Sequence, residues 1–189
     1  MSLKYNTKNI KLIFLIIILI FVIFIIYLLF RYLNTPVNNS YVKCNMKFGL
    51  CPAAKCVPSP YDNTKAFCYC DVKTGNNYSV GNNNCNNIQP YTNNSGEEMI
   101  FSDFSPIISK MGYHITKCPP EAVNLNCMNK ICSVDPNNHS KAICLCDKLD
   151  NNGLEWVTFN KNGEPKTCNY QSGASLQSYN NIKKFIENN

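Results

Sequence analysis

The chain has 189 residues, with 18 Lys and Arg, 12 Asp and Glu, and twelve cysteines. Four of the basic residues flank an apolar N-terminal run, and the other 14 exceed the 12 acidic residues by only two. Because this near-neutral remainder lacks clustered Lys and Arg, it argues against a nucleic-acid-binding protein.

An apolar run follows a short basic tail, residues 1–11. No charged residue occurs from Leu12 to Phe30, and this length at about 1.5 Å per residue spans the roughly 30 Å of a bilayer core. The run is longer than the core of a signal peptide, and no small-residue cleavage site follows it. We therefore expect a transmembrane signal anchor over residues 12–33, followed by a polar stalk over residues 34–43.

The charges beside the anchor predict its orientation. Lys4, Lys8 and Lys11 precede it and only Arg31 follows, so the positive-inside rule keeps the N-terminus in the cytosol or inside a particle. The C-terminal ectodomain is then extracytosolic, at a cell surface or in a virion envelope. The cysteine count agrees with this location, since disulfides persist in oxidising compartments.

A repeat organises the ectodomain. Cys51–Asp71 recurs as Cys127–Asp147, and an offset of 76 relates four cysteines and also Pro60, Lys65, Ala66 and Asp71 to their counterparts Pro136, Lys141, Ala142 and Asp147. A fixed offset of this kind indicates duplicated modules. We expect a six-cysteine module at 44–85, a linker at 86–117 and a second module at 118–168. Modules this short usually need cross-links to fold.

All twelve cysteines are expected in disulfides, because the even count is divided equally between the repeats. These residues are Cys44, Cys51, Cys56, Cys68, Cys70, Cys85, Cys118, Cys127, Cys132, Cys144, Cys146 and Cys168. The two cysteines of a C-x-C pair point the same way on a strand, so each can reach a different partner. Six cysteines allow about 15 pairings, and spacing alone does not choose among them.

The spacing resembles that of EGF-like modules. Both repeats have four residues between the second and third cysteines and one between the fourth and fifth. Phe67 precedes a fourth cysteine, and a Gly-x-x-aromatic run follows each fifth one, ending at Tyr78 or Trp156. The resemblance implies the pairs Cys44–Cys56, Cys51–Cys68, Cys70–Cys85, Cys118–Cys132, Cys127–Cys144 and Cys146–Cys168. The final loops of 14 and 21 residues are longer than the family usually has, so another two-hairpin disulfide scaffold stays open.

Three further segments carry local signals. Ser105 as N-cap, Pro106 at the first helical position and Gly112 as the stop predict a short helix in the linker. Leu154–Phe159 followed by Asn162-Gly163 predicts a short hairpin. In the tail, residues 169–189, apolar residues spaced as on one face of a helix predict an amphipathic helix that packs back on the ectodomain; these are Leu176, Tyr179, Ile182, Phe185 and Ile186.

The residues that carry chemistry in other proteins lack their usual patterns here. There is no C-x2-C pair, and His114 and His139 have no ligand-like spacing, so we expect no zinc. The calcium-binding motif of EGF-like modules is missing before Cys44 and Cys118, so we expect no cofactor. Asp71 and Asp147 are interpreted as turn residues that accept backbone hydrogen bonds. The protein is therefore not expected to be an enzyme, and a disulfide-exchange enzyme would normally show C-x-x-C.

The predicted fold is small, disulfide-rich and mainly β, with two hairpin-type modules and one N-terminal transmembrane helix. Its predicted function is to bind a receptor or another surface protein, with the membrane and proteins as partners and neither nucleic acid nor a small-molecule substrate. Candidate binding residues lie in the variable last loops, namely Tyr78, Trp156 and Phe159, although Trp156 also suits a small core. Candidate glycosylation sites are Asn38, Asn77, Asn93 and Asn138.

An alternative function comes from the layout and the composition. Frequent Asn, Ile, Lys, Tyr and Phe suggest an AT-rich genome, such as that of a large DNA virus or a protist. Small N-anchored, disulfide-bonded proteins occur in viral entry complexes, and the layout is similar to that of the per os infectivity factors of insect viruses. The alternative is therefore a structural subunit of a viral envelope entry or infectivity complex.

Overall fold

The computed structural model describes residues 7–33, 40–82, 84–163 and 166–189, and within the first range it describes the side chains of residues 13–28. The chain divides into two compact units, residues 1–38 and residues 39–189. The candidate glycosylation site Asn38, residues 1–6 of the expected tail and residues 34–39 of the expected stalk lie outside the described residues.

The first unit contains one helix, α1 (Thr7–Leu33). The apolar side chains described along it, from Ile13 to Leu28, are all exposed. Across the described parts of the chain, we find no helix with both the length and the apolar character needed to cross a membrane.

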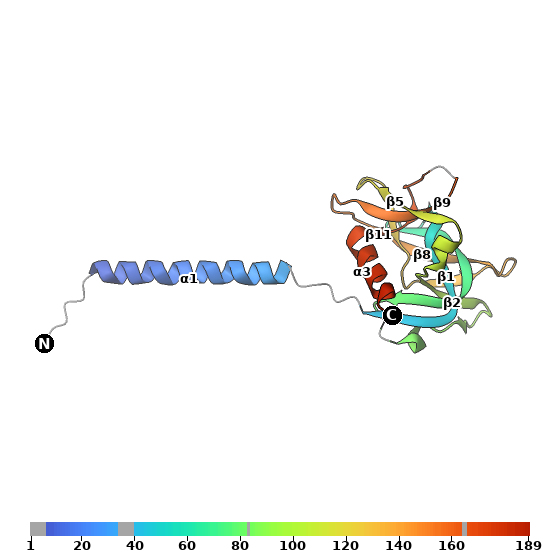
Figure 1. The fold of residues 1–189 in the computed structure, drawn as a ribbon, viewed down its shortest axis with the longest axis horizontal. Coiled ribbons are helices and arrows are strands. Elements are labelled where there is room, and N and C mark those ends of the chain that lie inside the picture. The colour runs from blue at the N-terminus through green and yellow to red at the C-terminus, as the bar shows by residue number, and fades with distance from the viewer. Residues whose placement is uncertain (1–6, 34–39, 83, 164–165) are drawn as a thin grey trace. The chain divides into compact units, whose positions relative to one another are not determined.

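The second unit is mainly β and disulfide-rich, as the sequence predicts (Figure 1). Its described residues form an eight-stranded sheet, in the order β2-β1-β10-β6-β8-β7-β4-β3, and a three-stranded sheet, in the order β11-β9-β5. The strands are β1 (Tyr41–Pro58), β2 (Lys65–Val80), β3 (Tyr91–Thr92), β4 (Glu98–Asp103), β5 (Tyr113–Cys118), β6 (Asn124–Asn126), β7 (Ile131–Val134), β8 (Lys141–Leu149), β9 (Trp156–Lys161), β10 (Gln171–Ser172) and β11 (Ala174–Ser175). The helical segments are η1 (Cys85–Ile88), α2 (Ile107–Lys110) and α3 (Leu176–Glu187).

Each repeat contributes one hairpin to the large sheet. β1 pairs with β2, β7 pairs with β8, and β2 and β8 pair with each other in antiparallel orientation. Cross-strand pairing therefore joins the two repeats within one compact unit, whereas the sequence suggested two separate modules. Because this unit holds all six disulfides and its own hydrophobic core, it meets the criteria for a fragment that folds alone.

The disulfides are nested within each repeat, and the pairing implied by the EGF-like resemblance is wrong. The twelve cysteines, all of them described, form Cys44–Cys85, Cys51–Cys70, Cys56–Cys68, Cys118–Cys168, Cys127–Cys146 and Cys132–Cys144. The reason is the hairpin: Cys56 lies opposite Cys68 and Cys132 lies opposite Cys144 in the strand registers. Antiparallel strands bring opposite residues within disulfide reach. The two cysteines nearest the turn of each hairpin therefore pair with each other, and the other two disulfides of the repeat enclose this pair in the sequence.

The core has an unusual composition because the cysteines form much of it. One buried cluster contains eight cysteines packed with Ala66, Ile100, Leu125, Val134 and Ala142 among others. A second cluster, which contains Phe48, Tyr78, Phe104 and Phe159, lies against α3. Disulfides therefore supply much of the interior that longer aliphatic side chains supply in larger domains.

The predicted local elements are present, with different boundaries or partners. The linker helix is the single turn α2; Pro106 is its N-cap, and Gly112, with φ of 81°, follows its end. The Ser105 hydroxyl does not cap this helix but donates to the Asn76 carbonyl oxygen at 2.7 Å. The linker residues before this helix form the strand β4.

The strand predicted at Leu154–Phe159 is present as β9, but the predicted hairpin partner after the Asn162-Gly163 turn is wrong. β9 pairs with β5 of the linker and with β11. Within the described residues, which omit 164–165, no strand pairing crosses the Asn162-Gly163 turn. The tail helix α3 packs back on the unit as predicted: Ile182 is buried and the Phe185 ring stacks on Tyr41 at 5.3 Å between ring centroids (Figure 1).

Candidate binding surfaces

The pairing of β2 with β8 has a local two-fold symmetry. Cys68 lies opposite Cys144, and these are equivalent positions of the two repeats. On either side, Ala66 lies opposite Cys146, and Cys70 lies opposite Ala142. Exchanging the repeats exchanges these two pairs, so the repeats contact each other as the subunits of a two-fold dimer do. We call this region the repeat junction.

Two equivalent ion pairs flank the repeat junction. The Lys65 ammonium lies 2.6 Å from Oδ1 of Asp147, and the Lys141 ammonium lies 2.6 Å from Oδ1 of Asp71. Each lysine belongs to one repeat and its carboxylate to the other. The interpretation of Asp71 and Asp147 as turn residues is therefore wrong, because both lie in strands and bind lysines across the junction.

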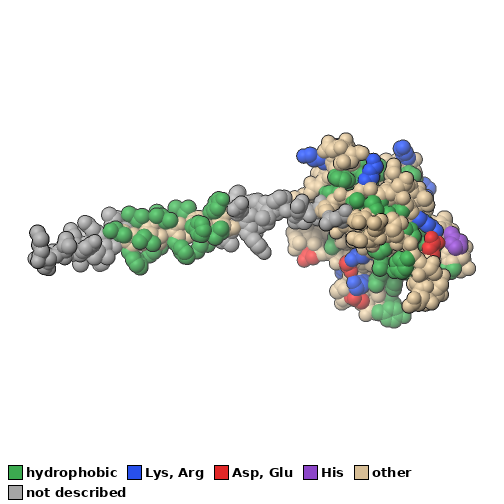
Figure 2. Space-filling view, turned by 90° about the horizontal axis from the view of Figure 1, so that it is seen from below, with side chains coloured by type: hydrophobic (Ala, Val, Ile, Leu, Met, Phe, Trp, Pro, Cys, Tyr) green, Lys and Arg blue, Asp and Glu red, His purple; other side chains and the backbone are tan. Residues whose placement is uncertain are grey.

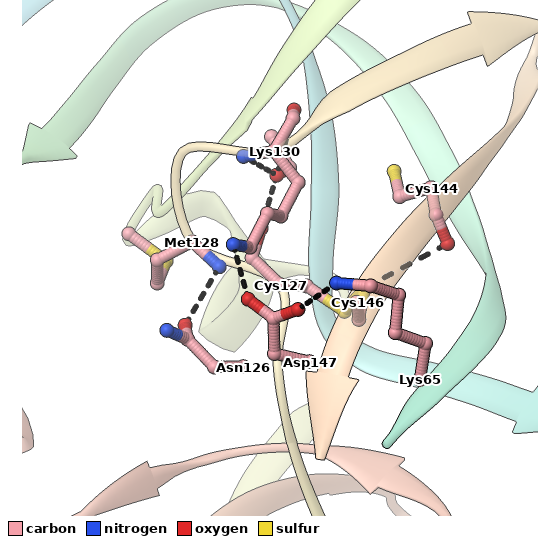
Figure 3. Close-up of polar contacts among 9 residues, drawn as sticks. Lys65, Asn126, Cys127, Met128, Lys130, Cys144, Cys146 and Asp147 are labelled. Carbon is pink, nitrogen blue, oxygen red and sulfur yellow. Dashed lines mark hydrogen bonds and ion pairs between the residues drawn. A yellow bond between two sulfur atoms is a disulfide. The ribbon is translucent and has the colours of Figure 1, made fainter. Parts of the chain in front are cut away.

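Asp147 has a second cationic partner, Lys130, whose Nζ lies 2.5 Å from Oδ2. Figure 3 shows the ammonium groups of Lys65 and Lys130 on the two oxygens of the Asp147 carboxylate. The hydrogen bonds from Lys130 and Lys65 lower the pKa of Asp147, and the hydrogen bond to Asp147 raises the pKa of Lys65.

The inner side of the repeat junction is packed with sulfur. In the described residues, the sulfur atoms of Cys51, Cys132 and Cys144 lie within 4.8 Å of one another, and so do those of Cys56, Cys68 and Cys127. Each cysteine of the second group is the counterpart, in the other repeat, of a cysteine of the first group. Zinc needs thiolates, and each of these sulfurs is held in a disulfide. The groups are therefore packing contacts between repeats.

The outer side of the repeat junction is apolar and exposed. We call it the junction face; it consists of Val57 on β1, Phe67 and Tyr69 on β2, Ile131 on β7, and Ile143 and Leu145 on β8. Val57 pairs with Phe67, which pairs with Leu145, while Tyr69 pairs with Ile143. Five of the six side chains are 41–52% exposed, and Phe67 is half-buried. Figure 2 shows that hydrophobic side chains do reach the surface of this unit beside charged ones.

The predicted binding residues lie elsewhere, in the interior. Tyr78, Trp156 and Phe159 are all buried. The Trp156 indole N–H donates to the Pro119 carbonyl oxygen at 3.1 Å, and its ring lies so close to Gly173 that a Cβ there would come within 2.4 Å of it. These aromatic residues therefore form core contacts and do not make up an exposed binding surface.

The three described glycosylation candidates differ in their surroundings. Asn138 is exposed in a turn and Asn93 is half-buried, with its amide donating to Glu97 at 2.7 Å. Asn77 is fully buried, and its amide donates to Oδ2 of Asp103 at 2.5 Å. A glycan on Asn77 is incompatible with this fold because the amide nitrogen has no path to solvent.

The junction face has a signal in the sequence, in the residues that alternate with the cysteines of β8. In Lys141–Asp147 every second residue is a buried Ala or Cys, and the residues between them are Lys, Ile, Leu and Asp. Alternation of this kind indicates a strand with two distinct faces. The apolar residues at Ile143 and Leu145 therefore marked an outward face, although the sequence could not show that β2 adds to it.

No protein-family model matches the sequence, and neither a curated protein nor a solved structure matches it. These comparisons therefore do not show that the chain is an EGF-like protein.

Proposed function

We propose that this protein is a single-pass membrane protein whose C-terminal unit binds another protein through the junction face. The anchor is the apolar run from Leu12 to Phe30, long enough for a bilayer core. The basic residues before the run favour an internal N-terminus. Six disulfides favour an oxidising, extracytosolic location for the unit that follows.

One observation carries the proposal, the exposed apolar cross-strand set of the junction face. Most strands place polar residues on an outward face, whereas here Val57, Tyr69, Ile131, Ile143 and Leu145 are each more than two-fifths exposed. Contiguous exposed apolar area rimmed by polar residues is typical of a protein-binding surface. A sheet face also presents these side chains on a rigid support, which lowers the entropy lost on binding.

The charges around the junction face indicate the chemistry of the partner. Among the described residues, five lysines lie on or beside it, against the carboxylates of Asp62, Asp71 and Asp147; the lysines are Lys55, Lys65, Lys73, Lys130 and Lys141. A second copy of the chain would oppose one lysine-rich rim with another. The face therefore suits a protein surface with an apolar centre and an acidic rim.

Site-specific crosslinking tests this proposal in the full chain. A photoreactive benzoylphenylalanine is placed at Tyr69 or Ile143 on the junction face. The matched control is Leu154, which is 66% exposed and lies in the loop between β8 and β9, outside the residues that make up the face. The chain is expressed in its native membrane and irradiated. We expect a discrete crosslinked protein from positions 69 and 143 and not from 154. The same products from all three positions, or none from 69 and 143, would rule out the junction face.

The same experiment separates the two forms that the function can take. A crosslinked protein on an opposing cell favours attachment to a receptor. A crosslinked protein in the same membrane, together with co-purification of several membrane proteins, favours the alternative of a structural subunit in a viral envelope complex. Neither form requires a catalytic residue.

A further inference from the structure

A pocket of about 300 Å³ opens beside the junction face, where β1 bulges away from β2. Leu50 pairs with Asp71, and the next pair is Lys55 with Tyr69. Four residues of β1 therefore lie opposite one residue of β2, and a surplus of this kind bends a strand locally. Two of the four are alanines that line the pocket, so their short side chains leave the space beside the bend unfilled.

The lining of this pocket combines an apolar interior with exposed lysines. Leu50 and Ile108 are buried, and Met111 and Tyr113 are half-buried. The exposed lining residues include Tyr69 and three lysines, namely Lys55, Lys141 and Lys161. Such a lining suits a ligand with an apolar part and an anionic end.

The single carboxylate among the described lining residues, that of Asp71, has lysines at both of its oxygens. Lys141 Nζ lies 2.6 Å from Oδ1, and Lys73 Nζ lies 4.0 Å from Oδ2. Lys55 and Lys161, by contrast, have no ion pair among the described residues. The described lining therefore offers an entering anion two ammonium groups and a carboxylate that is already paired.

We propose that this pocket receives a tyrosine that carries a sulfate or phosphate ester, on the protein that covers the junction face. The inference rests on the proposed function, because Tyr69 belongs to both the face and the pocket. The ring of such a side chain suits the apolar interior and the rings of Tyr69 and Tyr113, and its ester oxygens pair with Lys55 and Lys161. A bare carboxylate would pair with the lysines but would leave the apolar interior in water.

Four probes separate the ring from the charge. The folded fragment 40–189 is titrated with phenyl sulfate and phenyl phosphate, which carry both, with benzyl alcohol, which carries the ring alone, and with methyl sulfate, which carries the charge alone. The amide shifts of Lys55, Tyr69 and Tyr113 in NMR spectra report binding. We expect the phenyl esters to bind roughly 3- to 10-fold more tightly than either of the other probes, and the tighter ester identifies the modification.

Two double variants of equal net charge locate the site. Lys55→Gln with Lys161→Gln should abolish the preference for the phenyl esters over benzyl alcohol. Lys148→Gln with Lys184→Gln is the matched control and should keep that preference, because both lysines are exposed and neither lines the pocket. The NMR spectra also show whether both variants fold.

The outcome for this pocket is distinguishable from the outcome for the junction face. In the full chain, the variant Lys55→Gln, Lys161→Gln should lower the yield of the crosslink from position 143 roughly threefold or more. An unchanged crosslink, methyl sulfate bound as tightly as phenyl sulfate, or equal losses in the two double variants would overturn this inference and leave the junction face in place. So would heparin binding that the first variant abolishes while the crosslink persists, because the pocket would then hold a sulfated polysaccharide. The absence of any crosslink from positions 69 and 143 would instead overturn the proposed function itself.

Discussion

At the scale of single residues, Asp147 illustrates how the repeats depend on each other. Its carboxylate binds Lys65 of the first repeat and Lys130 of its own. The sequence showed that Lys65 and Asp71 recur as Lys141 and Asp147, and it could not show that each lysine binds the carboxylate of the other repeat. That relation depends on the register of β2 against β8, which is a tertiary property.

The lowered pKa of Asp147 gives a prediction about pH. A carboxyl whose pKa is lower in the folded state stabilises the fold above its ordinary value of 3.8, and this contribution is lost as the pH falls through the folded-state value. Asp147→Asn should lower the free energy of unfolding at pH 7 by about 0.5–1 kcal/mol, since the side chain is 39% exposed. The deficit should shrink as the pH falls below 3.8.

Urea unfolding of fragment 40–189 at several pH values measures this effect. Glu155→Gln is the matched control, because Glu155 is exposed and has no ion pair among the described residues. A deficit that is the same at acid and neutral pH would show that the carboxylate charge is not the cause.

Asp103 should behave in the opposite way. It is buried, its Oδ2 accepts from Asn77 at 2.5 Å, and its Oδ1 and the Asn77 Oδ1 have no partners among the described residues. Burial raises its pKa, so the folded state holds this proton to higher pH than the unfolded chain does. Stability should therefore fall as the pH rises from the ordinary value of 3.8 through the raised one.

Replacing this carboxyl by an amide should stabilise the protein at neutral pH. Asp103→Asn keeps an acceptor for Asn77 and adds an N–H for the unpaired Asn77 oxygen, so we expect a gain of about 1–2 kcal/mol at pH 7. Thermal and urea unfolding at pH 4 and pH 8 would show a larger gain at the higher pH. A variant that is less stable than the native protein at both pH values would contradict the account.

At the scale of elements, local signals located segments better than they located partners. The strand predicted at Leu154–Phe159 corresponds to β9. The alternation in Lys141–Asp147 corresponds to β8, although no strand was predicted from it. However, β9 pairs with β5, and the paired residues lie between 38 (Cys118 and Trp156) and 48 (Tyr113 and Lys161) positions apart in the chain. Such pairing depends on non-local contacts, which no short sequence window contains.

Both the tail helix α3 and its packing on the rest of the unit were predicted, because its apolar residues repeat with helical spacing. Ile182 is 6% exposed and belongs to the buried cluster with Phe48 and Phe159. Ile182→Ala should lower the free energy of unfolding by about 2–4 kcal/mol, the usual cost of such a cavity. Asn180→Ala, on the exposed side of the same helix, should change it by less than about 0.5 kcal/mol. Equal effects of the two substitutions in urea unfolding would mean that α3 is not docked.

At the scale of the whole molecule, the duplication produces one folded unit. The fixed offset was visible in the sequence, and so was the common direction of the two side chains in each C-x-C pair. Cys68 and Cys70 do face the same way, toward Cys56 and Cys51. The disulfide pairing implied by the EGF-like resemblance was wrong. The antiparallel hairpin of β1 and β2 places the cysteines of the nested pairs close to each other instead.

The same duplication explains why the candidate surface could not be predicted in full. Ile143 and Leu145 show an outward apolar face on one strand, and Phe67 and Tyr69 show it on another. Joining them requires the pairing of the two repeats about Cys68 and Cys144, where each repeat covers the edge of the other. The junction face is therefore a property of the joined repeats.

Disulfide mapping tests this arrangement most directly. The oxidised fragment 40–189 is digested without reduction, its thiols are blocked, and the linked peptides are identified by mass spectrometry with electron-transfer fragmentation to separate Cys68 from Cys70 and Cys144 from Cys146. The account predicts Cys56–Cys68, Cys51–Cys70 and Cys44–Cys85, with Cys132–Cys144, Cys127–Cys146 and Cys118–Cys168 in the second repeat. Recovery of Cys44–Cys56 together with Cys70–Cys85 would contradict it, because neither bond is compatible with the nested hairpins.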